Sequence, residues 1–219
     1  VFGHSQGGHS SLWTGHLGPE IAPELNLVGV AAAAPAAELK LIMGAQWNTA
    51  AGWALGPEAA VAWKAIDPDL PFDGVITEDG QKNTESLAED CILRAALEGE
   101  LRSKFGGQYF EINPAESAPW ARIVDEQTPP PLPASMPVFV AQGTADEVVL
   151  PWPQAVLQEK WCAAGSNLTM LWMGDIDHMA AAKTAGPQVV TWIADRFAGK
   201  PATPACDGPM PVPPAPPAN

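Results

Sequence analysis

Three short apolar runs stand out along the sequence. They lie at residues 25–34, 137–143 and 168–173, and few polar side chains interrupt them. Runs of this length without polar alternation are typical of strands that are buried on both faces of a parallel sheet. The pattern therefore predicts three core strands at these positions.

Helical patterns separate and follow these runs. Residues 7–17 predict a helix that ends at Gly18 and Pro19, because proline cannot continue the ladder of backbone hydrogen bonds. Apolar side chains at helical spacing predict two more helices, at about 153–164 and 185–197. Strands that alternate with helices indicate an α/β protein with a parallel sheet.

The interval 38–133 has a different pattern. It contains helical stretches at about 39–47, 57–66, 86–97 and 101–105, and it shows no clear strand. A helical insertion of this size between two core strands predicts a cap, or lid, over the active-site face of the sheet.

These patterns divide the chain into three parts. The core covers 1–37 and 134–200, the helical cap covers 38–133, and a tail rich in proline and alanine covers 201–219. A tail of this composition buries too little apolar surface to fold alone, so we expect it to be extended or disordered beyond Cys206. Four large side chains of the cap are either walls of an acyl chamber or ordinary core: Trp47, Trp53, Leu55 and Trp63.

Composition and charge narrow the class of protein. The 219 residues are 47% hydrophobic, which is enough for one sizeable core and favours a single domain with decoration. A net charge of -14 repels phosphate backbones and anionic lipid headgroups, so we exclude nucleic acid as a partner. No apolar run approaches the roughly 20 residues that cross a bilayer, and no signal-peptide pattern is present. We expect no transmembrane segment and no cofactor.

The candidate chemistry begins at Gly3-His4-Ser5-Gln6-Gly7, which has the pattern G-x-S-x-G. In an α/β-hydrolase this pattern forms the nucleophile elbow, where a strand turns sharply into a helix and exposes a serine hydroxyl. Because Gly3 and Gly7 lack Cβ atoms, strand and helix can approach closely around a strained serine backbone. The motif therefore predicts Ser5 as a nucleophile.

A serine nucleophile needs a base, and the chain has four histidines. His4, His9 and His16 belong to the elbow and its helix, where a base is too close along the chain to be aimed at the Ser5 hydroxyl. His178 is remote in sequence and lies in a loop after the third predicted strand. Such a loop reaches the carboxyl edge of the sheet, where ligands of open α/β folds bind. We therefore predict His178 as the base.

The acid that orients the base should lie between Ser5 and His178, since this fold uses the chain order serine, acid, histidine. Asp146 lies in the turn after the second predicted strand, and Glu147 is its nearest competitor. A carboxylate at this place could also be a helix cap or a solvated loop residue. We select Asp146 as the acid. Two further acids are interpreted as loop residues that shape the turn near the histidine: Asp175 and Asp177.

Acyl transfer also needs an oxyanion hole, which is a pair of backbone N–H donors for the charge that develops on the carbonyl oxygen. The N–H of Gln6, the residue after the nucleophile, is predicted as one donor. In this fold the second donor comes from a loop upstream of the elbow, which this sequence does not contain. Loss of one donor costs about 10²–10³ in rate, so the chain alone could keep the triad and still be a weak enzyme.

Three cysteines remain, at Cys91, Cys162 and Cys206. They show neither C-x-x-C spacing nor nearby histidines, so we expect no zinc site and no other metal. A disulfide between Cys162 and Cys206 could tie the tail to the body of the protein. For Cys91 two alternatives are open, a buried free thiol or a partner in a segment outside this sequence.

Five segments together carry a resemblance to a known family. They are the elbow 3–8, the acid turn 143–146, the segment Lys160-Trp161-Cys162, the Asp177-His178 loop and the closing stretch 192–201. Together they resemble the secretory lipases of the α/β-hydrolase superfamily, particularly the bacterial ones, over about residues 1–206. The resemblance implies a carboxylic ester hydrolase with Ser5, Asp146 and His178 as nucleophile, acid and base.

The resemblance has further implications for structure and location. It implies a helical cap over an acyl-binding tunnel, a disulfide between Cys162 and Cys206, and a secreted, extracellular protein. The family carries an N-terminal half with several strands, the second oxyanion donor and a secretion signal. We therefore expect this chain to be an N-terminally truncated α/β-hydrolase, the C-terminal part that starts at the elbow.

Three functional hypotheses follow. The first is an esterase or lipase that acts on a small-molecule or lipid ester through an acyl-enzyme intermediate. The second is an acyltransferase or peptidase on the same triad. The third is a non-catalytic fragment that works only when paired with its missing half. Because a sheet edge at Val1 and Phe2 would be exposed, we also expect self-association through that edge.

Overall fold

The structure is a computed structural model that describes residues 1–217. It contains two compact units, one formed by Val1–Glu38 together with Pro129–Asn219, the other by Leu39–Thr128. The last two positions of the predicted tail, 218 and 219, lie outside the described residues. The sheet and every predicted site residue belong to the first unit.

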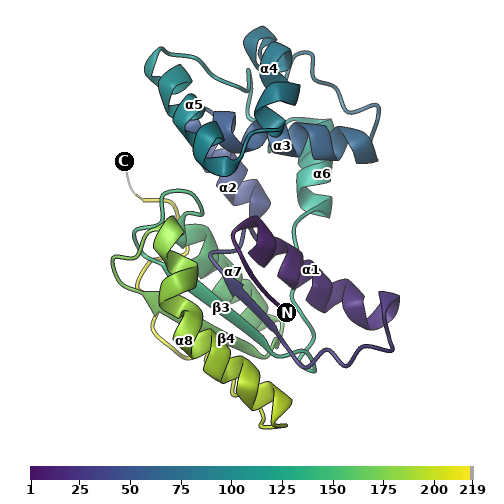
Figure 1. Cartoon of the computed structure of the whole chain (residues 1–219), viewed down its shortest axis with the longest axis vertical. Helices are drawn as coiled ribbons and strands as arrows, with labels where there is room; N and C mark the ends of the chain where they lie inside the picture. Colours follow the sequence, from purple (N-terminus) through teal and green to yellow (C-terminus); the bar gives the residue numbers. More distant parts are fainter. Residues whose placement is uncertain (218–219) are drawn as a thin grey trace. The chain divides into compact units, whose positions relative to one another are not determined.

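A parallel sheet of four strands forms the centre of the first unit (Figure 1). The strands lie in chain order across the sheet and are β1 (Phe2–His4), β2 (Val30–Ala33), β3 (Val138–Gly143) and β4 (Leu168–Met173). β2 and β3 are buried along their whole length, which accounts for their uninterrupted apolar sequences. The three strands predicted from the apolar runs are therefore confirmed.

Helices cover both faces of this sheet. They are α1 (Gln6–Ile21), α7 (Pro151–Ala163) and α8 (His178–Phe197). On one face, Val140 packs in a core with Leu12 of α1 and Leu157 of α7. On the other face, the ring of Phe139 contacts Trp192 of α8, with ring centroids 5.7 Å apart. Successive side chains of β3 thus face different helical layers, as in an α/β fold with a doubly covered sheet.

The strand predicted at 25–34 is shorter in the structure. Only Val30–Ala33 pairs in the sheet, because the chain before it turns. In that turn, the Leu25 N–H donates to the carbonyl of Ala22 at 3.0 Å. The apolar run therefore continues beyond the strand that it predicts.

The prediction that Gly18 and Pro19 end the first helix is wrong. α1 continues to Ile21, with Pro19 inside it. The missing N–H of Pro19 removes one backbone hydrogen bond near the end of the helix. The following turn still closes, because the Ala22 N–H donates to the carbonyl of Gly18 at 2.9 Å.

The last helix begins earlier than predicted. α8 starts at His178 rather than at about 185, and it contains Pro187. The side chain of Asp177 accepts a hydrogen bond from the Ala180 N–H at 2.8 Å, which is the geometry of an N-cap. His178 is therefore the first residue of a helix, and its predicted placement in a loop is wrong.

The second unit is helical. Its helices are α2 (Leu39–Gln46), α3 (Ala50–Ile66), α4 (Glu78–Ala88), α5 (Ile92–Lys104) and α6 (Ala118–Glu126). Aromatic rings that meet edge to face form its core: Trp53, Trp63, Tyr109, Phe110 and Trp120. Trp53 and Trp63, two of the candidates for chamber walls, are core residues of this unit. Its role as a cap stays a prediction.

The helices α4, α5 and α6 of this unit differ from the sequence prediction. The stretch 86–97, predicted as one helix, spans the end of α4 and the start of α5, and a break at 89–91 separates them. α6 has no predicted counterpart. Pro119 lies in the first turn of α6. Backbone N–H groups in a first turn have no acceptor inside the helix, so the N–H that proline lacks costs no helical hydrogen bond.

A disulfide joins Cys162, at the end of α7, to Cys206 in the tail. The Ala205 N–H donates to the carbonyl of Leu168 at 2.9 Å, so the tail lies beside the start of β4. The pairing that the family resemblance implies is therefore present. Cys91 is a free, exposed thiol at the N-cap of α5, so the first of its two alternatives, a buried free thiol, is wrong.

Candidate active site

Ser5 lies in the sharp turn between the end of β1 and the start of α1. Its backbone has φ 56° and ψ -120°, a conformation that costs a non-glycine residue about 1–3 kcal/mol. The Ser5 N–H donates to the carbonyl of Ala33 on β2 at 2.9 Å, which holds the strained residue against the sheet. The strand, the strained serine and the helix are the parts of a nucleophile elbow.

Two glycines allow this turn to be tight, and one of them was not predicted. A Cβ atom on Gly3 would lie 2.0 Å from the carbonyl oxygen of Gly7, and a Cβ on Gly8 would lie 3.0 Å from the Cβ of Pro35. Among the described residues, nothing lies within 4 Å of a Cβ built on Gly7. The prediction that Gly7 is needed for close approach is therefore wrong, and Gly8 has that role.

His178 lies between the other two predicted residues. Its Nε2 is 2.9 Å from the Ser5 Oγ, and its Nδ1 is 2.9 Å from the Asp146 Oδ2. Since a carboxylate accepts, Nδ1 carries the hydrogen, which leaves Nε2 to accept the hydrogen of the Ser5 hydroxyl. The structure thus brings the three residues predicted as nucleophile, acid and base into one hydrogen-bonded chain.

Asp146 is held through both of its carboxylate oxygens. Oδ1 accepts the N–H groups of Val148 and Val149 at 2.9 and 2.8 Å, while Oδ2 accepts from His178 and from the Gln142 amide. The residue is only 2% exposed, so water competes little for these bonds. Its neighbour Glu147 is exposed, and it is Asp146 that reaches His178.

Gln142 is a residue of this site that the sequence did not reveal. It is fully buried in β3, and its Nε2 donates to the Asp146 Oδ2 at 3.2 Å and to the Val149 carbonyl at 3.0 Å. Its one sequence signal is that it is the single amide in an otherwise apolar run, directly before the glycine that ends the strand.

The loop that carries Asp146, the predicted acid, is in close contact with the loop that leads into α8 and His178, the predicted base. A Cβ on Gly143 would lie 2.1 Å from the carbonyl oxygen of Ile176, and that oxygen accepts the Ala145 N–H at 3.1 Å. The Asp175 N–H donates to the Thr144 Oγ1 at 2.9 Å. Asp146 and His178 are therefore held together by the loops that follow two neighbouring parallel strands, at the carboxyl edge of the sheet.

The other three histidines lie close to the elbow or on α1. The His4 Nε2 is 2.9 Å from the carbonyl oxygen of His178, and burial lowers the pKa of His4 below its usual value. His9 accepts a hydrogen bond from the Trp13 indole at 3.2 Å, and His16 contacts the same indole edge to face. His4 thus contacts the backbone of the predicted base.

Gln6 is the first residue of α1. The N–H groups of a first helical turn have no acceptor inside the helix, and they lie at its positive end. The role of the Gln6 N–H as an oxyanion donor stays a prediction.

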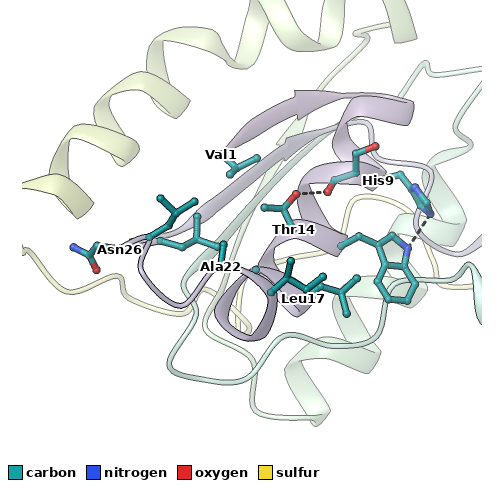
Figure 2. A pocket seen from close by; sticks show the side chains of 12 residues that line it. Val1, His9, Thr14, Leu17, Ala22 and Asn26 are labelled. Atoms are coloured by element: carbon teal, nitrogen blue, oxygen red, sulfur yellow. Dashed lines mark hydrogen bonds between the residues drawn. The ribbon is translucent and has the colours of Figure 1, made fainter.

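An apolar groove of about 550 Å³ lies along α1 (Figure 2). It is lined by Val1, by α1 residues from His9 to Ile21 and by the following segment up to Leu27. Ser5, Asp146 and His178 are not among its lining residues. This groove is therefore a different feature from the hydrogen-bonded chain at the elbow.

Within residues 1–217, no group of three or more histidine, cysteine, aspartate or glutamate side chains is arranged to hold a metal ion. Within the same range, no helix has the length and apolar composition of a membrane span.

Comparison with known proteins places this geometry in a family. The chain matches the secretory lipase family over residues 1–205. It is 28% identical to Lipase 5 of Candida albicans over 94% of its own length, and 26% identical to a probable inactive lipase of Mycobacterium tuberculosis over 93%. Both matches cover 46% of the relative, so the chain spans about half the length of the curated relatives that it matches.

Solved structures agree in fold. Candida antarctica lipase A in its closed state superposes with a TM-score of 0.74 at 21% identity, over 96% of this chain and 51% of the other. The rice cell wall degrading esterase LipA of Xanthomonas oryzae gives 0.70 at 18% identity, over 91% and 58%. These similarities identify the sheet and its helices as an α/β-hydrolase fold, and the match over residues 1–205 shows that the chain belongs to the secretory lipase family.

Proposed function

We propose that this chain is a carboxylic ester hydrolase of the esterase or lipase type, with Ser5 as nucleophile, His178 as general base and Asp146 as the acid that orients it. One observation carries the proposal, namely the chain of two hydrogen bonds, each 2.9 Å long, from the Ser5 Oγ through His178 to the Asp146 Oδ2. Nucleophilic catalysis by serine needs this order of groups and this tautomer of the histidine.

The reaction follows from these positions. Ser5 Oγ attacks the ester carbonyl carbon while His178 Nε2 takes the hydroxyl proton. The negative charge on the carbonyl oxygen is stabilised by backbone N–H donors, of which the Gln6 N–H is one. His178 then gives its proton to the leaving alcohol, and an acyl group remains on Ser5. Water, activated by His178 in the same way, releases the acid and restores the serine.

Asp146 has two tasks in this cycle. It keeps the hydrogen of His178 on Nδ1, and its charge stabilises the imidazolium that forms when Nε2 takes a proton. The four hydrogen bonds to its two oxygens prevent the carboxylate from rotating away.

The relatives support the substrate class. Those named above are described as lipases or as an esterase, and one is described as probably inactive. The geometry around Ser5, rather than a relative's name, is therefore the basis of the proposed activity. The family's description as secretory and the disulfide are consistent with an extracellular location.

Labelling with a fluorophosphonate tests the triad directly. We expect the reagent to modify the peptide that contains Ser5, because only an activated serine reacts quickly with it. Ser5→Ala should abolish the label, and His178→Ala should slow labelling about 10³-fold or more. His16→Ala, a histidine of α1 that contacts Trp13, is the matched control and should label like the unmodified chain. A label that persists in Ser5→Ala would contradict the proposal.

Substrate choice separates the chemical alternatives. Turnover of p-nitrophenyl esters of increasing acyl length, without turnover of matched amides, supports an esterase or lipase. Amide hydrolysis at a similar rate would favour a peptidase. Transfer of the acyl group to an added alcohol, faster than to water, would favour an acyltransferase.

A second candidate function rests on the length of the relatives, of which the chain spans about half. In this alternative the chain contributes the triad, while a further polypeptide supplies the second oxyanion donor and makes it active. A folded chain that does not react with fluorophosphonate alone, and reacts when that polypeptide is added, would favour this alternative.

A further inference from the structure

His4 connects the strand that leads into Ser5 to the helix that begins at His178. It is the last residue of β1, and its Nε2 lies 2.9 Å from the carbonyl oxygen of His178. The two imidazole rings also pack together, with centroids 4.7 Å apart and planes inclined by 38°. Because a carbonyl oxygen only accepts, the His4 Nε2 carries a hydrogen and donates it.

This contact does not involve the reacting atoms. In the proposed cycle the Ser5 oxygen loses its hydrogen bond to the His178 Nε2 as soon as it is acylated. The bond from His4 goes to the backbone of His178, so acylation leaves it intact. His4 can therefore keep the start of α8 against the end of β1 at the stage when Ser5 no longer does.

The surroundings of His4 favour an uncharged ring. Burial lowers the pKa of His4, and repulsion from the His178 ring lowers it further. The hydrogen bond to the His178 carbonyl and the charge of Asp146 act in the opposite direction and are weaker. The titratable groups that face the ring are thus His178 on α8 and Asp146 in the loop after β3. A positive charge on His4 would repel the imidazolium that His178 becomes during each proton transfer.

We propose that His4 is a positioning residue for the base: its neutral imidazole holds His178 in place by the hydrogen bond to the His178 carbonyl and by ring packing. This inference rests on the proposed function and adds to it a residue outside the triad. His4 needs no contact with the substrate for this role.

Three substitutions separate the parts of the contact. His4→Gln keeps an N–H donor close to the position of Nε2 without a ring, His4→Phe keeps a ring without a donor, and His4→Ala keeps neither. We expect kcat for a p-nitrophenyl ester to fall about tenfold in His4→Phe and further in His4→Ala, with little change in KM. His4→Gln should keep most of the original kcat.

The pH profile distinguishes this role from a general loss of structure. Because the pKa of His4 is lowered, the ring is neutral above that pKa and gains its charge as the pH falls through it. If activity requires both His4 and His178 to be neutral, two protons must be lost on the acid side of the profile. The plot of log kcat/KM against pH should then approach a limiting slope of about two at low pH. His4→Gln cannot titrate, so its slope should be about one. Equal slopes in the two proteins would overturn the requirement for a neutral His4.

A second readout does not depend on turnover. The proton between the His178 Nδ1 and Asp146 gives a resonance far downfield in the proton NMR spectrum. The chemical shift of this resonance depends on the hydrogen bond and therefore on the position of the imidazole. We expect this signal to be retained in His4→Gln and displaced or broadened in His4→Phe. If the unmodified chain neither cleaves esters nor reacts at Ser5, the proposed function fails, and this signal still tests His4. An unchanged signal in both His4→Phe and His4→Ala would overturn the positioning role.

Discussion

Gln142 holds Asp146, the proposed acid, from inside the sheet. Its amide donates to the Asp146 Oδ2 and to the Val149 carbonyl, and it is fully buried. The same amide also donates to the Gly143 carbonyl at 3.1 Å. Gln142→Leu keeps roughly the volume of the side chain and removes the hydrogen bonds from this amide to Asp146, Val149 and Gly143. We expect a loss of about 1–3 kcal/mol in the free energy of unfolding, measured by urea denaturation. We also expect fluorophosphonate labelling at Ser5 to slow about tenfold, because Asp146 loses one of its supports.

A second buried glutamine provides the matched control. Gln158 on α7 is 3% exposed, and its Oε1 accepts a hydrogen bond from the Trp172 indole at 2.8 Å. Gln158→Leu should also destabilise the chain, but it should leave the rate of labelling at Ser5 unchanged. If both variants slow labelling equally, the effect of Gln142 comes from stability alone and not from Asp146.

At the scale of single residues, the sequence predicts the residues that a motif or a fixed order along the chain identifies. Ser5 is fixed by its motif, and Asp146 and His178 by the order serine, acid, histidine. Gln142 and His4 carry no such signal. The partner of His4 is 174 residues away, and the value of a buried amide depends on which acceptors the folded loop places around it. Both roles appear only once the loops are in place.

The elbow is the element with the least steric freedom. A Cβ on Gly3 would lie 2.0 Å from the Gly7 carbonyl oxygen, which is backbone and cannot move without shifting the first turn of α1. We expect Gly3→Ala to cost about 2–4 kcal/mol in the free energy of unfolding and to abolish labelling at Ser5. Thermal unfolding and fluorophosphonate labelling measure the two effects.

Gly7→Ala is the internal control for this prediction. Among the described residues nothing lies within 4 Å of a Cβ at this position, and Gly7 is helical. Alanine should therefore fit and raise the free energy of unfolding by about 0.5–1 kcal/mol, since glycine is a poor helix former. Equal damage from both substitutions would show that the glycines matter for something other than the close approach of strand and helix.

The bounds of strands were predicted well where burial and pairing determine them. The bounds of helices were predicted poorly where a proline or a cap lies near them. The strand β3 matches its apolar run because it is buried along its whole length, and β4 matches its run because it pairs with β3 at every position. Pro19 and Pro187 lie inside helices that the sequence prediction ended or began elsewhere. Pro19 lies near the end of α1 and Pro187 in the middle of α8. Each removes one backbone hydrogen bond, and packing of the rest of the helix outweighs that loss.

At the scale of the whole molecule, the sequence predicts a parallel α/β sheet but not how its parts are tied together. The order β1-β2-β3-β4 follows chain order, because consecutive strands are usually neighbours in a sheet, and here this holds even across the helical unit that separates β2 from β3. The positions of Cys162 and Cys206 made their pairing one possibility, and the family resemblance implied it, because three cysteines alone allow other pairings. The segment between the two cysteines contains β4 and α8. The proposed base, His178, is the first residue of α8 and therefore lies within this segment.

Loss of this disulfide should therefore lower the stability of the entire first unit. The two cysteines are 44 residues apart, so the bond restricts the unfolded chain, and replacing both by serine should cost about 2–4 kcal/mol. Urea denaturation of Cys162→Ser/Cys206→Ser against the unmodified chain measures the loss. Cys91→Ser, at an exposed free thiol, is the control and should leave the transition unchanged. If the double variant unfolds at the same urea concentration as the unmodified chain, then the packing of α7, α8 and β4 holds the unit without the bond.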